Sequence, residues 1–85
     1  MADNKKKLKA LCKCLYELNS SKKIEEFLVG ILTPKELAEI PTRLEIIRLL
    51  KAGVPQREIA DKLGVGIATI TRGARELKSG KFSDL

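Results

Sequence analysis

The chain has 85 residues, a formal net charge of +6 and no histidine. A single domain of this length buries only about 60–65% of its unfolded surface, so its core alone is only marginally stable. Further stabilisation is needed, for example from a partner chain. The lack of histidine removes the commonest general base, and we find no nucleophile–base pair, metal cluster or phosphate-binding loop. We therefore expect neither an enzyme nor a metal site, and the charge favours a polyanionic partner.

The positive charge gathers at the two ends of the chain. Residues 1–23 carry a net charge of +5 and residues 55–82 carry +3, whereas residues 24–54 carry −1. We therefore expect a scaffold in the middle and contact surfaces at the ends.

The two cysteines and the apolar runs bear on the compartment. Cys12 and Cys14 are separated by one residue, too close for a comfortable disulfide, which suggests reduced thiols in a cytoplasmic protein. Cys12 also falls at an apolar helical spacing and is expected in the core. No apolar run has the roughly 18–20 residues that a membrane span needs, so we expect no membrane partner.

Apolar residues recur at helical spacing and no segment alternates with period two, so we predict an all-α fold of about six short helices. The first helix runs from about Asn4 to Leu18. Its apolar stripe consists of Leu8, Leu11, Cys12, Leu15 and Leu18. Asn19-Ser20-Ser21 ends this helix and caps a second one, which is striped by Ile24, Phe27, Leu28 and Ile31.

Two capping boxes are predicted in the middle of the chain. Thr33-Pro34-Lys35-Glu36 starts a short helix from about Pro34 to Glu39, which Pro41 then breaks. Thr42-Arg43-Leu44-Glu45 repeats the pattern and starts a helix to about Lys51. That helix is apolar almost all round, as expected for one buried on several sides at the centre of a dimer. Gly53 ends it.

The pattern from Gln56 to Leu77 predicts a helix-turn-helix. Pro55 opens the first helix, on which Ala60 supplies the small residue that a crossing helix needs. Gly64 tolerates the positive φ of the turn, Val65 plugs the core, and Ile70 faces inward from a helix running from about Ile67 to Leu77 or Lys78. A plain pair of antiparallel helices is the alternative. We expect one domain over residues 1–85, with a dimerisation scaffold at 4–52, a DNA-reading head at 55–78 and a frayed tail at 79–85.

One face of the last helix carries small, polar and basic residues, as insertion into the DNA major groove requires. Ile67 and Ala68 can contact thymine methyls, Thr71 offers a hydroxyl, and Arg75 and Lys78 offer charge. Gln56 and Arg57 can bind phosphate at the start of the preceding helix. The predicted DNA-binding residues are Gln56, Arg57, Gly66, Ile67, Ala68, Thr71, Arg75 and Lys78. A solvated basic surface is the alternative for the charged ones.

A third face of the same helix, formed by Thr69, Arg72 and Glu76, points to neither core nor groove. Arg72 and Glu76 are four residues apart, which suits an exposed salt bridge. A pocket for a small ligand is the second interpretation, and the helical geometry does not choose between them.

These residues carry a family resemblance. Gln56-Arg57-Glu58 and the run GVGIATITRG at residues 64–73 resemble the helix-turn-helix of the bacterial Trp repressor family. Leu32-Thr33-Pro34 and Thr42-Arg43 resemble its upstream segments, so that about residues 24–78 are covered. The resemblance implies an intertwined homodimer that binds a palindromic double-stranded DNA operator and takes L-tryptophan as corepressor.

The resemblance also implies a ligand site. Arg43 and Arg72 would lie on the two faces of the indole, Thr33 and Thr69 beside the ligand, and Gly73 beneath it. Glu76 stands where the family has a serine that contacts the ligand's amino group. The implied ligand-binding residues are Thr33, Arg43, Thr69, Arg72, Gly73 and Glu76.

The sequence also departs from the family pattern. The stretch between Arg43 and Gly64 is one residue shorter, and Ala60 replaces a basic contact residue. The chain ends at Leu85, before the family's last dimerisation helix, so dimerisation is expected to rest on residues 8–50.

Three hypotheses follow. The first is a homodimeric DNA-binding transcriptional regulator, a repressor responsive to L-tryptophan or a related amino-acid-like ligand. The second is the same kind of regulator with no small-molecule corepressor and no required cofactor. The third is a helical protein-interaction module.

Overall fold

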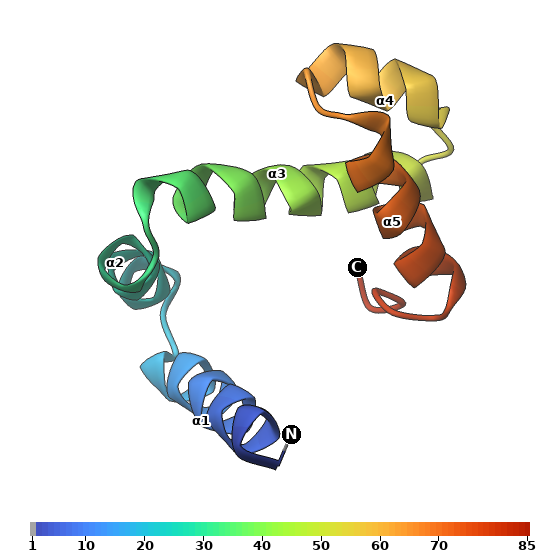
Figure 1. Cartoon of the computed structure of the whole chain (residues 1–85). Helices are drawn as coiled ribbons and strands as arrows, with labels where there is room; N and C mark the ends of the chain where they lie inside the picture. The colour runs from blue at the N-terminus through green and yellow to red at the C-terminus, as the bar shows by residue number, and fades with distance from the viewer. Residues whose placement is uncertain (1) are drawn as a thin grey trace. The chain divides into compact units, whose positions relative to one another are not determined.

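The computed structural model describes residues 2–85, which form five α-helices and, within that range, no strand (Figure 1). The helices are α1 (Ala2–Leu18), α2 (Ser21–Ile31), α3 (Pro34–Lys51), α4 (Gln56–Leu63) and α5 (Ile67–Lys78). The all-α prediction is confirmed, with five helices instead of about six. None of the helices in the described part is long and apolar enough to cross a membrane.

The chain forms two compact units, one ending at Leu37 and one running from Ala38 to Leu85. The predicted single domain with a scaffold at 4–52, a head at 55–78 and a tail at 79–85 stays a prediction.

In the first unit, α1 and α2 leave their apolar side chains largely uncovered. Asn19 has a left-handed φ of 48° at the end of α1, and the Ser20 hydroxyl caps α2 by accepting a 3.3 Å hydrogen bond from the Lys23 amide. No residue of α2 is buried, and Leu8 on α1 is 59% exposed. Cys12 is exposed as well, so its predicted place in a core is wrong for this chain, because two helices alone provide no surface to cover it.

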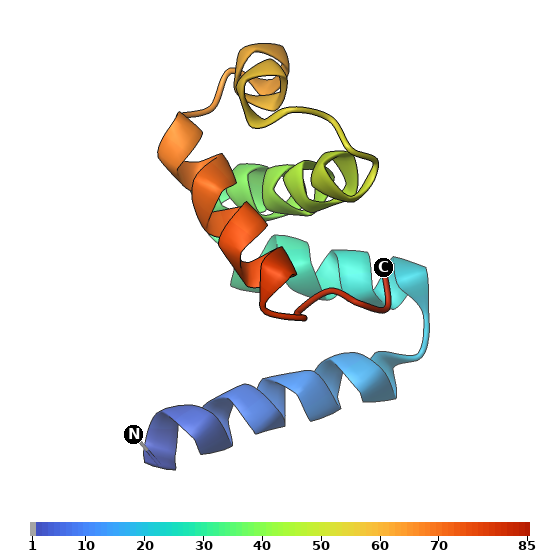
Figure 2. The same cartoon turned by 90° about the vertical axis from the view of Figure 1, so that its right-hand side faces the viewer.

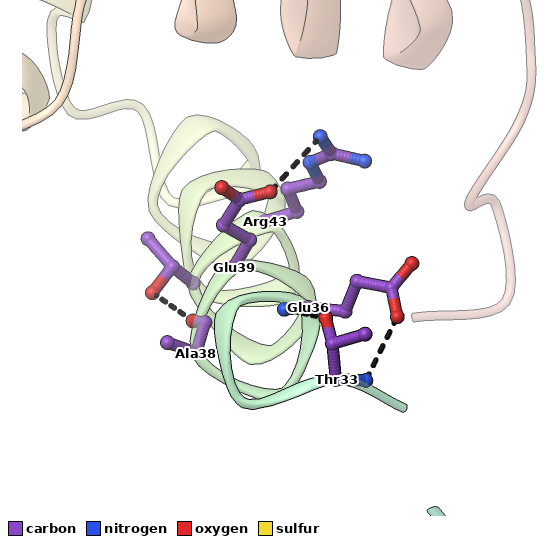
Figure 3. A network of polar contacts seen from close by, with 6 residues as sticks. Thr33, Glu36, Ala38, Glu39 and Arg43 are labelled. Atoms are coloured by element: carbon purple, nitrogen blue, oxygen red, sulfur yellow. Dashed lines mark hydrogen bonds and ion pairs between the residues drawn. The ribbon is translucent and has the colours of Figure 1, made fainter. Parts of the chain in front are cut away.

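The start of α3 is a complete capping box (Figure 3). The Thr33 hydroxyl accepts from the Glu36 amide at 3.2 Å, and the Glu36 carboxylate accepts from the Thr33 amide at 2.9 Å. The backbone N–H of Thr33, and then its hydroxyl, lower the pKa of Glu36, because both stabilise the charged form. The predicted start signal is confirmed.

The predicted break at Pro41 is wrong, because α3 continues through it from Pro34 to Lys51 (Figure 1). Proline removes one backbone hydrogen bond and crowds the preceding turn, which costs about 3 kcal/mol inside a helix. Pro41 itself is exposed, so its ring needs no place in a packed core. Thr42 does not cap a new helix, since its hydroxyl instead donates to the Ala38 carbonyl at 2.9 Å (Figure 3). Established helix on both sides therefore outweighs the local stop signal.

The core of the second unit is a cluster of three isoleucines, one from each of its helices. Ile46 of α3, Ile59 of α4 and Ile70 of α5 are at most 1% exposed. Partly buried residues pack around them, among them Ala60 and Val65, as the turn pattern predicts. This cluster fixes α4 and α5 on the second half of α3.

The turn between α4 and α5 has the predicted backbone. Gly64 ends α4 in the left-handed conformation, with φ 65° and ψ 34°, and its amide donates to the Ala60 carbonyl at 2.9 Å. Gly66 then precedes α5 in an extended conformation. Likewise, Gly53 has a φ of 87° just beyond α3.

The tail is not frayed. Residues 79–84 form turns that bring the chain back after α5 (Figure 2). The Lys51 ammonium donates to the Phe82 carbonyl at 2.9 Å and also to the Leu85 carbonyl. The sequence does not reveal these two hydrogen bonds, because Lys51 lies 31 residues from Phe82 and 34 residues from Leu85.

We predict that Ile59→Ala lowers the free energy of unfolding by about 2–5 kcal/mol, since it opens a cavity at a fully buried site. Urea denaturation at a fixed chain concentration measures this. Ile67→Ala is the control: its side chain is 51% exposed, and the change should stay within about 0.5 kcal/mol. Equal losses in the two variants would contradict the assigned core.

We predict that Thr33→Ala raises the pKa of Glu36 part of the way toward its ordinary value, because the backbone N–H contact survives and the hydroxyl is lost. A pH titration followed by NMR of the Glu36 side chain measures it, with Thr33→Ser as the control that keeps the hydroxyl. Because the folded-state pKa is lowered, the stabilisation is present above the unfolded pKa and is lost as the pH falls through the folded one. An unchanged pKa in Thr33→Ala would contradict the hydroxyl's stabilisation of the Glu36 carboxylate.

Candidate functional site

The second unit presents one exposed polar and basic surface along α4 and α5. All eight residues predicted to bind DNA are exposed. They comprise Gln56 and Arg57 on α4, Gly66 before α5, and Ile67, Ala68, Thr71, Arg75 and Lys78 on α5. The isoleucine core covers the opposite faces of the same helices. Packing therefore leaves the predicted reading residues open to an external partner, while their role stays a prediction.

A side-chain hydrogen bond joins the two helices at this surface. The Thr71 hydroxyl on α5 donates to Oε1 of Gln56, the first residue of α4, at 3.0 Å. This bond holds the Gln56 amide in place, and its NH₂ group can donate to an acceptor such as a phosphate. Sequence reasoning placed both residues in the interface but did not foresee that they contact each other.

Both helices begin without a side-chain cap. Pro55 precedes α4 and Gly66 precedes α5, and neither makes a side-chain capping hydrogen bond. The first backbone N–H groups of these helices and the positive ends of their dipoles therefore suit an anion. Arg57 in the first turn of α4 adds a full charge. Glu58 in the same turn carries the opposite charge, so phosphate binding by this surface stays a prediction.

Beside this surface lies a cavity of about 400 Å³ between α3 and α5. That volume falls within the range of small-molecule sites. It is lined by Arg43, Ile46 and Ile47 from α3, by Ala68, Thr69, Arg72, Gly73 and Glu76 from α5, and by Phe82. Five of the six residues implied as ligand contacts thus share one cavity, and their role in ligand binding stays a prediction. Ala68 lines it too, so this predicted DNA contact borders both surfaces.

Gly73 lets the two helices approach closely at this cavity. A methyl group on Gly73 would lie 3.2 Å from Cδ1 of Ile47 and 3.6 Å from Cγ2 of Ile46. The first distance is tighter than ordinary van der Waals contact. The small residue therefore sets the spacing of α3 and α5, and with it the spacing of the two arginines.

The charged groups of the cavity have weak partners. The Arg43 guanidinium lies 3.9 Å from the Glu39 carboxylate, with 67% of its side chain exposed (Figure 3). Glu76 lies 4.0 Å from the Lys81 ammonium. Exposed pairs of this length contribute about 0–1 kcal/mol, so a ligand could displace them at little cost.

Thr33, the sixth residue implied as a ligand contact, belongs to the first unit, where its hydroxyl caps α3, and its ligand role stays a prediction. Phe82, assigned to a frayed tail, lines the cavity. The only signal for Phe82 in the sequence is that it is one of two phenylalanines in a chain with 4% aromatic residues.

Comparison with known proteins identifies the family. A sequence model described as Trp repressor protein matches residues 6–83. A Trp operon repressor homolog of Vibrio campbellii is 48% identical over 61 residues, covering 71% of this chain and 61% of that protein. One from Vibrio parahaemolyticus is 48% identical over 60 residues, covering 69% of this chain and 58% of that protein. One from Actinobacillus succinogenes is 49% identical over 57 residues, covering 66% and 56%.

The matched stretch spans little more than half the length of these curated relatives. It nevertheless accounts for about two thirds of this chain, and the family model reaches across nearly all of it. The chain belongs to the Trp repressor protein family.

Proposed function

We propose that this chain is a homodimeric transcriptional regulator that binds double-stranded DNA through a helix-turn-helix formed by α4 and α5. The observation that supports the proposal is that all eight predicted DNA-contacting residues are exposed on α4, α5 and the turn between them, while Ile59 and Ile70 of the same helices are buried. Family membership supports regulation and agrees with the expectation that the chain is not an enzyme.

In this proposal α5 enters the major groove and the start of α4 meets the backbone. Ile67, Ala68, Thr71 and Arg75 read base edges, and Gln56, Arg57 and Lys78 contact phosphates. Phosphate contacts supply affinity that falls with salt, whereas the base contacts supply specificity. Two heads about one helical turn apart, roughly 34 Å, would match a palindromic operator.

Uncovered apolar side chains support a homodimer. Tyr16 on α1 is 85% exposed, and Val29 and Ile31 on α2 are 57% and 56% exposed. Ile40 and Leu44 on α3 are also exposed. Exposed large apolar side chains on each of three successive helices are typical of a chain that associates with a partner. A second copy of the chain would cover them and complete the marginal core.

For the cavity we propose L-tryptophan or a related amino-acid-like ligand as corepressor. Arg43 and Arg72 both line the cavity, and guanidinium groups stack on aromatic rings and bind carboxylates. The relatives are named as repressors of a trp operon, which supports the same choice. A regulator without a corepressor is the second candidate, favoured by Glu76, whose carboxylate already has Lys81 as a neighbour.

We predict that Arg57→Ala weakens binding to duplex DNA about 5–10-fold for any sequence and lowers the slope of log affinity against log salt by about 1, because one phosphate contact is lost. Fluorescence anisotropy with a labelled duplex at several salt concentrations measures both. The matched control is Lys62→Ala, which removes an exposed lysine in the last turn of the same helix. It should lower the DNA affinity and the salt slope less than Arg57→Ala does. Failure of the chain to bind any duplex would support a protein-interaction module instead.

We predict that L-tryptophan binds the chain and raises its affinity for operator DNA. The chain contains no tryptophan, so the fluorescence of the added ligand reports binding without background from tryptophan residues. Arg72→Ala should weaken ligand binding at least about 10-fold, the cost of a charged hydrogen-bonding partner. Arg48→Ala on α3, outside the cavity, should leave it unchanged. Equal DNA affinity with and without L-tryptophan would contradict the corepressor.

A further inference from the structure

One residue of the segment Ser79–Leu85 (the strap) lines the cavity. Phe82 borders the same cavity as Arg43 and Arg72, with 39% of the residue exposed. All residues of the strap are exposed, so its contacts with the second unit are the cavity position of Phe82 and hydrogen bonds from α3.

One lysine ties the strap to α3. The ammonium of Lys51, the last residue of α3, donates to the Phe82 carbonyl at 2.9 Å and also to the carbonyl of Leu85. A single side chain thus connects two points of the strap to the helix that carries Arg43. At its other end the strap continues from α5, where the Lys81 amide donates to the Glu76 carbonyl at 3.2 Å.

The backbone of the strap is shaped to bring Phe82 to the cavity. Gly80 has a φ of 96° and Phe82 a φ of 64°, so the chain passes twice through the left-handed region as it turns back after α5 (Figure 2). A phenylalanine adopts this conformation only where surrounding contacts hold it there. The Lys51 hydrogen bond acts on the carbonyl of Phe82 itself.

Phe82 is a wall of the cavity and not its occupant, because about 400 Å³ remains open with Phe82 in place. The cavity is lined by two arginines, one glutamate, one phenylalanine and two isoleucines, among other residues. Such a lining suits a ligand with a planar apolar ring and a carboxylate.

We propose that the strap is a movable side of the ligand pocket, held shut by Lys51, and that Phe82 is its ligand-facing residue, which selects for a planar ring. This inference rests on the ligand pocket of the proposed function and deepens it. It does not depend on DNA binding, because neither Lys51 nor Phe82 lies among the predicted DNA contacts.

The first test asks whether Lys51 holds the strap. Trypsin needs an extended backbone around Lys81, which the turns of the strap do not offer while Lys51 holds them, so Lys51→Met in the full chain should speed this cleavage at least about 5-fold relative to cleavage in α1 of the same molecule. Lys62→Met is the matched control and should leave the ratio unchanged. An equal ratio in wild type and Lys51→Met would overturn the strap.

The second test asks whether Phe82 faces the ligand. With L-tryptophan as the fluorescent probe, Phe82→Ala should weaken binding at least about 5-fold and Phe82→Leu less, since leucine restores apolar area but not the ring. L-tryptophan should also slow cleavage after Lys81 in the wild-type chain. Unchanged or tighter binding by Phe82→Ala, or no binding by wild type, would overturn the ligand-facing assignment.

These outcomes are distinguishable from a failure of the proposed function. If the DNA-binding proposal is wrong, the wild-type chain binds no duplex, whatever the cleavage ratio. If the strap proposal is wrong, the Lys51 and Phe82 variants leave the cleavage ratio and the L-tryptophan affinity unchanged, and this result does not depend on duplex binding.

Discussion

The contact of Ile46, Ile59 and Ile70 holds together everything that the second unit presents for function. Each isoleucine comes from a different helix, and all three are almost completely buried. Apolar burial of this kind is the main favourable term in folding, and here it comes mainly from one small cluster. The outward faces of α4 and α5 carry the predicted DNA contacts, and the gap between α3 and α5 is the cavity. The predicted DNA-contacting surface and the cavity therefore both depend on the packing of these three isoleucines.

That arrangement explains how the two sites could influence each other. Ala68 belongs to the exposed surface and also lines the cavity, and Gly73 sets how closely α5 approaches α3. A ligand between Arg43 and Arg72 would contact α5, the helix that we propose reads DNA. Coupling of this kind needs only a difference in ligand affinity between two positions of α5. The strap adds a third element, since Lys51 connects it to the end of α3.

Local signals in the sequence predicted most of the fold. The capping box at Thr33–Glu36, the left-handed Gly64 and the inward Ile70 depend on residues close in sequence, and all appear as predicted. The family resemblance predicted five of the residues that line the cavity, namely Arg43, Thr69, Arg72, Gly73 and Glu76. Three of them, Thr69, Arg72 and Glu76, also form the face of the last helix that the helical geometry assigned to neither core nor groove.

The sequence did not reveal features that depend on competing local signals or on contacts between residues far apart in the chain. Pro41 is a strong stop signal, yet helix propagation from both sides overrides it. Cys12 fits an apolar stripe, but a stripe does not say what covers it, and in this chain it is exposed. Phe82 reaches the cavity through a hydrogen bond to Lys51 that spans 31 residues, and no local pattern encodes such a contact.

The central claim is that one chain is half of a DNA-reading unit whose exposed apolar helices are covered by a second copy. Sedimentation equilibrium of the chain with and without a palindromic duplex tests it most directly. The account predicts a mass of two 9.4 kDa chains at low micromolar concentration and two chains per duplex in the complex. A stable, folded monomer that binds duplex DNA as a single copy would contradict it.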